Sequence, residues 1–126
     1  MEDHIPVVGI DLGTRNSCMS IWRNKKQEII TDKFGYRTVP STIAFYNSVR
    51  IMGYNAICLK DVLPENTIYD LKRLIGRKFD DPDIQKMKDF ITYNICENEK
   101  TGNIDILVNN KKYKVEDLYS SFISEL

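Results

Sequence analysis

The chain has 126 residues, which is enough for one modest domain with a limited core and too few for a two-lobed enzyme. Eighteen basic and eighteen acidic side chains cancel, so the composition provides no long-range attraction to nucleic acid or to an anionic membrane. The three cysteines are widely spaced and form no Cys-x-x-Cys pair, which argues against a disulfide scaffold or a zinc site and for a reducing compartment.

The N-terminal residues 1–4, Met-Glu-Asp-His, are acidic and lead into no signal-like apolar region, so we predict no signal peptide. No apolar run approaches the length of a membrane span. We therefore expect a cytoplasmic monomer without nucleic-acid or membrane partners.

The stretch from Val7 to Cys18 carries the main chemical signal. Its first six residues are largely apolar and β-branched, which predicts a buried strand over residues 7–12. Gly13 then permits a tight turn and the close approach of a ligand, and successive amides after it can form an anion-binding nest. A carboxylate does not favourably face bare phosphate, so Asp11 is expected to hold a hydrated divalent ion. The pattern indicates a nucleotide site, although Asp-x-Gly-Thr also occurs in ordinary hairpins.

The first half of the chain is predicted to be rich in hairpins. Further strands are expected over residues 18–23, 27–31, 42–46 and 49–52, followed by a helical piece over 55–60. The first three strands would form an antiparallel sheet. Cys18 is expected to be a small buried residue, and Trp22 to serve in packing or in an interface.

A short helix is predicted over residues 68–75. Asn66 and Thr67 are suitable N-cap residues, and Gly76 is a natural stop. Lys72 falls at the edge of the apolar face of this helix, where its ammonium has a specific place to reach. Position alone favours the simpler alternative, in which the stem lies on apolar surface and the ammonium stays in water.

The second half is predicted to contain two more helices and a small meander. Asp81-Pro82 is typical of a helix start, with the helix continuing to about Phe90. Strands are expected over residues 91–97, 104–108 and 112–115. An amphipathic helix then begins at Val115 or Glu116 and has no stop signal before Leu126.

Four ordered segments are similar to those of a known family. They are Gly-Ile-Asp-Leu-Gly-Thr at 9–14 with Asn-Ser-Cys at 16–18, Gly-x-Arg-Thr-x-Pro-Ser at 35–41, Gly53 with Ala56, and Asn-Thr-Ile-Tyr-Asp-Leu-Lys-Arg-Leu-Ile-Gly-Arg-Lys-Phe-Asp-Asp at 66–81. With them the sequence resembles the ATPase domain of the seventy-kilodalton heat-shock chaperone family, within the actin-like and sugar-kinase-like superfamily. A kinase or actin of that superfamily would not share the block at 66–81.

The resemblance implies an α+β (α/β) fold of actin-like ATPase, ribonuclease H-like architecture, present as an incomplete N-terminal lobe. Residues 1–39 would form the phosphate-loop part, 40–115 a small subdomain, and 116–126 the start of a helix that returns to the ATPase lobe. The cofactors implied are ATP or ADP and Mg²⁺. The partners implied for the complete protein are unfolded client peptides and co-chaperones.

The site residues implied by the resemblance lie on two segments. Asp11 matches the aspartate near the magnesium water shell, and Gly13 with Thr14 matches the turn that contacts the phosphates. Lys72 matches the lysine near the γ-phosphate and the attacking water, where an ammonium stabilises developing charge. Lys72 and Asp11 are thus the expected catalytic residues.

Arg15 and Asn16 complete the expected cofactor-binding set, although Arg15 stands where the family usually carries threonine. The family's second phosphate loop, other magnesium-side carboxylates and adenosine pocket would lie beyond Leu126, so this chain alone is expected to be inactive. Two alternatives stay open: the front of an actin-like or sugar-kinase-like ATPase, and a non-catalytic lobe that binds co-chaperones.

Overall fold

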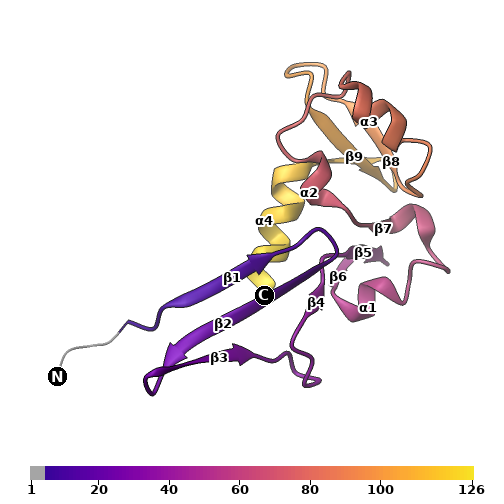
Figure 1. Ribbon diagram of the computed structural model, residues 1–126. Coiled ribbons are helices and arrows are strands. Elements are labelled where there is room, and N and C mark those ends of the chain that lie inside the picture. The colour runs from indigo at the N-terminus through magenta and orange to yellow at the C-terminus, as the bar shows by residue number, and fades with distance from the viewer. Residues whose placement is uncertain (1–4) are drawn as a thin grey trace.

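A computed structural model describes residues 5–126, which fold into three small antiparallel sheets linked by short helices (Figure 1). The mixed α+β class expected from the sequence is confirmed. The acidic residues 1–4, on which the signal-peptide prediction rests, lie outside the described residues. Within residues 5–126, no helix has both the length and the apolar character needed to cross a membrane.

The first sheet confirms the predicted order of three antiparallel strands. It contains β1 (Val8–Leu12), β2 (Asn16–Arg23) and β3 (Lys26–Ile30), with the short β4 (Val39–Pro40) paired to the start of β2. Asn24 and Lys25 turn between β2 and β3 with positive φ angles of 52° and 61°, as tight hairpins require. The sheet extends from the rest of the chain as an arm (Figure 1).

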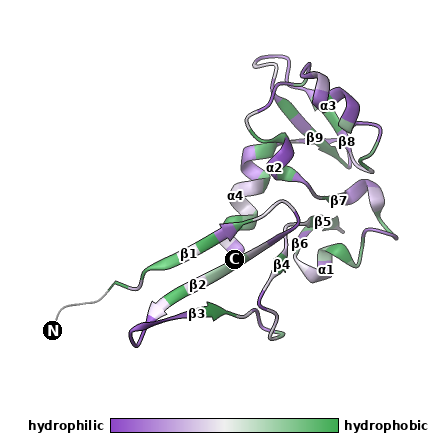
Figure 2. Cartoon of the chain, in the orientation of Figure 1, coloured by the Kyte–Doolittle hydropathy of each residue, from purple (hydrophilic) through white to green (hydrophobic). Residues whose placement is uncertain are grey.

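The prediction that the first strand is buried is wrong. Val8 and Ile10 are 44% and 48% exposed, and only Leu12 of β1 packs against the core cluster. Figure 2 shows this apolar character along β1 and part of β2. Cys18 is half-buried instead of buried, and Trp22 is 61% exposed, so Trp22 does not pack in the core. The residues have strand-forming side chains, but no described element covers most of their surface.

The second sheet forms the centre of the molecule. It consists of β6 (Val49–Met52), β5 (Ile43–Tyr46) and β7 (Thr67–Ile68), with α1 (Tyr54–Ile57) next to β6 and the 3₁₀ turn η1 (Pro64–Asn66) before β7. Ile43 and Ile68 pair across β5 and β7 and are fully buried. This pairing anchors the chain just before the predicted site helix.

The helix predicted over residues 68–75 is much shorter, because only α2 (Leu71–Leu74) is helical. Asn66 does not cap it, since its amide donates to the Phe45 carbonyl at 3.2 Å. The Thr67 hydroxyl likewise donates to Leu63 O at 2.8 Å. Long-range strand pairing therefore overrides local helix propensity at this position.

The third sheet confirms the predicted meander. It contains β8 (Asn94–Glu97), β9 (Ile104–Val108) and β10 (Lys111–Lys114), and it is flanked in sequence by α3 (Pro82–Met87) and α4 (Val115–Glu125). Both α3 and β8 are shorter than predicted, and Phe90 lies outside α3 with 82% of its surface exposed. The α4 face that carries Leu118 and Phe122 is buried in the core, as expected. All three cysteines are free.

Candidate functional site

The turn between β1 and β2 has the tight backbone that a phosphate loop needs. No side chain fits at Gly13, because an added Cβ would lie 2.1 Å from the Asn16 carbonyl oxygen. Thr14 is half-buried, whereas Arg15 and Asn16 are exposed. Glycine is therefore required for the turn itself, because the Asn16 carbonyl fills the space that a side chain would take, and polar side chains follow immediately after it.

Ser41 fixes this turn from the other side. Its hydroxyl donates to the Gly13 carbonyl at 2.8 Å, and its backbone N–H donates to the Arg15 carbonyl at 2.8 Å. The hydroxyls of Ser17 and Ser41, both buried, also lie 2.8 Å apart. Pro40 brings Ser41 here because β4 pairs with Asn16 and Ser17 at the start of β2. The Pro-Ser motif therefore has a structural role in the loop that sequence reasoning did not identify.

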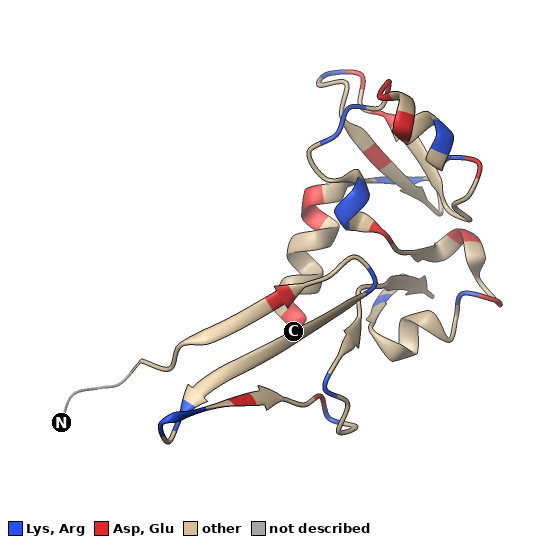
Figure 3. Ribbon diagram, viewed as in Figure 1, with Lys and Arg blue, Asp and Glu red and all other residues tan. Residues whose placement is uncertain are grey.

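Lys72 reaches the same turn from α2. Its ammonium donates to the Leu12 carbonyl at 2.9 Å, across 60 residues of sequence. Leu71 and Leu74 are buried and hold the short helix in place, while the Lys72 residue is itself exposed. Figure 3 shows the basic α2 beside the turn that joins β1 to β2. The ammonium is thus fixed on the loop, not extended freely into water.

Asp11 lies near the end of β1, directly across the ladder from Cys18. Asp11 is exposed. No group of three or more potential metal ligands is found in residues 5–126, so this carboxylate is not part of an all-protein cage. A single exposed carboxylate fits Mg²⁺, which keeps several of its waters and binds few protein oxygens directly.

Thr14, Arg15, Asn16 and Lys72 line two neighbouring clefts, whereas the other two expected site residues, Asp11 and Gly13, line neither. A cleft of about 500 Å³ is lined by Thr14, Asp70 and Lys72 together with residues of α3. A second cleft of about 350 Å³ is lined by Thr14, Arg15 and Asn16. The structure therefore brings Thr14 and Lys72 to one cleft, and it places Arg15 and Asn16 on the other.

Comparison with known proteins decides the family of the chain. A family model described as "Hsp70 protein" matches residues 7–126. The chain belongs to the Hsp70 family. The match corresponds to the N-terminal region of the Hsp70 nucleotide-binding domain, which confirms the resemblance drawn from the motifs.

Relatives of Hsp70 type come from distant organisms. The chain is 46% identical over 129 residues to "Heat shock protein 70 homolog" of Acanthamoeba polyphaga mimivirus, covering 95% of this chain and 14% of the relative. It is 44% identical over 108 residues to "Heat shock 70 kDa protein cognate 1" of Drosophila simulans, covering 82% of this chain and 50% of the relative. It is 35% identical over 125 residues to "Heat shock 70 kDa protein 2" of Paracoccidioides lutzii, covering 96% of this chain and 19% of the relative. The chain thus spans half or less of the length of these relatives.

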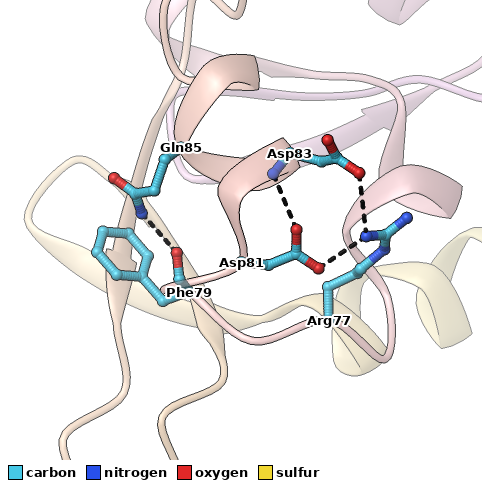
Figure 4. Close-up of polar contacts among 5 residues, drawn as sticks. All are labelled: Arg77, Phe79, Asp81, Asp83 and Gln85. Carbon is cyan, nitrogen blue, oxygen red and sulfur yellow. Dashed lines mark hydrogen bonds and ion pairs between the residues drawn. The ribbon is translucent and has the colours of Figure 1, made fainter.

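The Hsp70-like block at residues 66–81 leads into a polar cluster that shapes the larger cleft (Figure 4). Arg77 Nη1 donates to Asp81 Oδ2 at 2.7 Å and lies 3.7 Å from Asp83 Oδ2. Asp81 also caps α3 by accepting from the Asp83 N–H at 2.9 Å, as its sequence position predicted. The hydrogen bond from Arg77 holds the pKa of Asp81 below its ordinary value. The Arg77 link was not identified from the sequence, although its i, i+4 spacing from Asp81 was a usable signal.

The same segment is secured by a second contact. The Gln85 amide donates to the Phe79 carbonyl, so the first turn of α3 is tied to the chain that precedes it (Figure 4). Arg77 and Asp83 line the larger cleft together with Lys72. In this Hsp70 chain, the segment that follows α2 therefore forms an ordered wall opposite the loop.

Proposed function

We propose that this chain supplies part of the ATP site of an Hsp70 chaperone. In the proposal, the complete protein hydrolyses ATP to drive cycles of unfolded-peptide binding and protein folding, with client peptides and co-chaperones as its partners. The observation that carries the proposal is the 2.9 Å contact between Lys72 Nζ and the Leu12 carbonyl. It holds a cation beside a glycine turn whose shape excludes side chains.

The proposed architecture is an N-terminal lobe of the actin-like ATPase type with a ribonuclease H-like core. Residues 1–39 form its phosphate-loop part, 40–115 a small subdomain, and 116–126 a helix that returns to the ATPase lobe. The core supports this division, because the first sheet contributes only Leu12 and Val39 to the cluster that the later strands and helices share. We also propose a cytoplasmic location, in keeping with the three free cysteines.

In this site the turn binds the phosphates of ATP or ADP. Gly13 makes the tight turn possible, Thr14 provides its amide and hydroxyl, and Arg15 and Asn16 provide polar groups at the far end of the turn. Lys72 holds its positive charge where a terminal phosphate would come to lie, and it stabilises the charge that develops there during transfer to water. Its hydrogen bond to Leu12 orients the ammonium before any ligand arrives.

Asp11 would hold the magnesium ion through water. Bound Mg²⁺ supplies positive charge to phosphate oxygens during hydrolysis. The contribution of the chain is to keep one carboxylate exposed next to the turn, two residues before Gly13. Asp11 and Lys72 are accordingly the proposed catalytic residues, and the chain alone is expected to lack turnover because the relatives are much longer.

The test is calorimetric titration of the 126-residue chain with magnesium-ATP. We expect binding by the wild type, and a loss of affinity of about tenfold or more in Asp11→Ala, because carboxylates that orient the metal shell typically contribute that much. Asp89→Ala changes another exposed carboxylate and serves as the matched control. Equal binding by Asp11→Ala and wild type, or no binding by either, would contradict the proposed site.

A second candidate function is supported by the exposed arm. Val8, Ile10 and Trp22 present apolar surface on the first sheet, as expected for a non-catalytic lobe that binds a co-chaperone or exchange factor. This function needs no nucleotide. Tight magnesium-ATP binding by the chain would therefore rule it out as the sole role.

A further inference from the structure

The smaller cleft beside the loop contains a cation that the proposed ATP site does not use. Its lining includes Lys60 from the segment after α1, opposite Arg15 and Asn16 from the turn. Thr14, Tyr69 and Asp70 line both this cleft and the one that holds Lys72. The two clefts therefore meet along the turn, with Lys60 in one and Lys72 in the other.

The Lys60 ammonium is held in a defined place. Its Nζ lies 4.0 Å from the centroid of the Tyr69 ring, within the range of a cation–π contact. The Tyr69 ring is in turn packed edge-on against Tyr93, with ring centroids 5.2 Å apart. The Tyr93 hydroxyl donates to the Tyr69 carbonyl at 2.6 Å, and burial raises the pKa of Tyr93, so this donor keeps its proton. Lys60 thus rests on a rigid support at the edge of the cleft.

The surroundings of Lys60 favour an anion. Among the ion pairs found in residues 5–126, none involves Lys60. Asp70 is the acidic residue that lines the same cleft, and Arg15 adds a second cation. The backbone of Arg15 is fixed by the 2.8 Å hydrogen bond from the Ser41 N–H to its carbonyl. The cleft therefore combines two cations with one carboxylate, next to the turn that we propose binds phosphate.

The positions of Lys60 and Lys72 indicate which way a phosphate chain would lie along the turn. Lys72 contacts Leu12, at the beginning of the turn, whereas Arg15 and Asn16 are at its end and face the cleft of Lys60. A phosphate chain that follows the turn would meet Lys72 at one end and Lys60 at the other. If the terminal phosphate is at Lys72, the inner phosphates are at Lys60.

We propose that Lys60 is a nucleotide-binding residue that contacts the inner phosphates and so contributes equally to the binding of nucleoside diphosphates and triphosphates. This role rests on the proposed ATP site. It differs from that of Lys72, whose position next to the terminal phosphate makes it matter more for the triphosphate. Lys60 and Lys72 would together define which way the phosphate chain lies.

The experiment is an NMR titration of the isotope-labelled 126-residue chain with magnesium-ADP and magnesium-ATP, followed through amide chemical shifts. Lys60→Gln removes the charge, and Lys60→Arg keeps it. Lys88→Gln is the matched control, because Lys88 also lies over an aromatic ring, 5.1 Å from the Phe79 centroid, but lines neither cleft. Unchanged shifts of buried amides in the third sheet would establish that each variant is folded.

We expect Lys60→Gln to weaken the binding of ADP and of ATP by the same factor, about five- to tenfold, as for the loss of one charge-assisted contact. The affinities of Lys60→Arg and Lys88→Gln for both nucleotides should stay within about twofold of the wild-type affinities. Unchanged affinity in Lys60→Gln, or an effect on ATP alone, would overturn the assignment, as would a loss in Lys60→Arg equal to that in Lys60→Gln. These results leave the ATP site standing if Asp11→Ala still weakens binding by about tenfold or more. A wild-type chain that binds neither nucleotide would overturn both proposals.

Discussion

Ser41 illustrates how the shape of the loop depends on a side chain far away in sequence. Its hydroxyl is hydrogen-bonded to Gly13, 28 residues earlier, and contacts the hydroxyl of Ser17. Gly13 itself could be predicted from the sequence, because a tight turn is a local property of the backbone. The function of Ser41 could not, since nothing in a local pattern shows which distant carbonyl a hydroxyl will meet. The contact between Lys72 and Leu12 could not be predicted from local sequence patterns either, because the two residues are 60 positions apart.

Replacing Ser41 by alanine should destabilise the chain by about 1–3 kcal/mol, because the buried Ser17 hydroxyl and the Gly13 carbonyl lose a partner. Urea unfolding followed by circular dichroism measures this change. Ser124→Ala is the control, since Ser124 is exposed and its hydroxyl bonds only within α4, so its change should stay within about 0.5 kcal/mol. Equal urea midpoints for Ser41→Ala and Ser124→Ala would show that the hydrogen bonds of the Ser41 hydroxyl do not stabilise the fold.

At the scale of elements, sequence patterns predicted the type of most segments better than their ends. The meander and α4 follow from alternation and amphipathic spacing, and both are present. The helix expected over residues 68–75 does not form over its full length, because Ile68 pairs with Ile43 in the second sheet. Asp70 then adopts a left-handed conformation with φ 58°, so the helix begins only at Leu71. These are tertiary effects on a segment whose local residues favour a helix. The start of α3 at Asp81-Pro82 was predictable because a cap is a local interaction.

The start of α3 should respond to pH through Asp81. Its folded-state pKa is lowered, chiefly by the Arg77 hydrogen bond, so the stability it contributes is present above the ordinary aspartate pKa and is lost as pH falls through the lowered value. Asp81→Asn keeps a capping side chain without the charge, whereas Asp81→Ala removes both. At neutral pH the melting temperatures should fall in the order wild type, Asp81→Asn, Asp81→Ala. The difference between wild type and Asp81→Asn should shrink in acid, and a gap that persists at low pH would speak against the ion pair.

At the scale of the whole molecule, the three sheets differ in how well they are covered. The second and third sheets share one core with α4, and their central strands are buried. The first sheet contributes only its end to this core, through Leu12 and Val39. Alternation along a strand predicts which residues can be buried, but not whether another part of the protein is present to bury them. That is why Val8 and Ile10 were predicted inside and are found exposed.

The proposed role of Lys72 belongs to this scale because it requires the complete protein. In the complete Hsp70, Lys72→Ala should abolish ATP hydrolysis while nucleotide stays bound, because the ammonium acts on charge that develops in the transition state. Single-turnover hydrolysis and equilibrium binding measure the two effects separately. Lys88→Ala is the comparison, because it removes an exposed cation that lines neither cleft, and it should hydrolyse ATP at the wild-type rate. Turnover by Lys72→Ala at the wild-type rate would refute the catalytic role.

The long sequence separation of the Lys72 contact also orders events during synthesis. The β1–β2 hairpin can pair as soon as its own residues are available, but Ser41 follows Gly13 by 28 residues and Lys72 follows Leu12 by 60. Contacts between distant residues form late because closing a long loop costs chain entropy. A newly made chain therefore passes through a stage in which the hairpin exists without its cation. If the turn and Lys72 hold a phosphate as proposed, that capacity arises only when the second sheet has docked, and ligand binding would then report that folding has progressed that far.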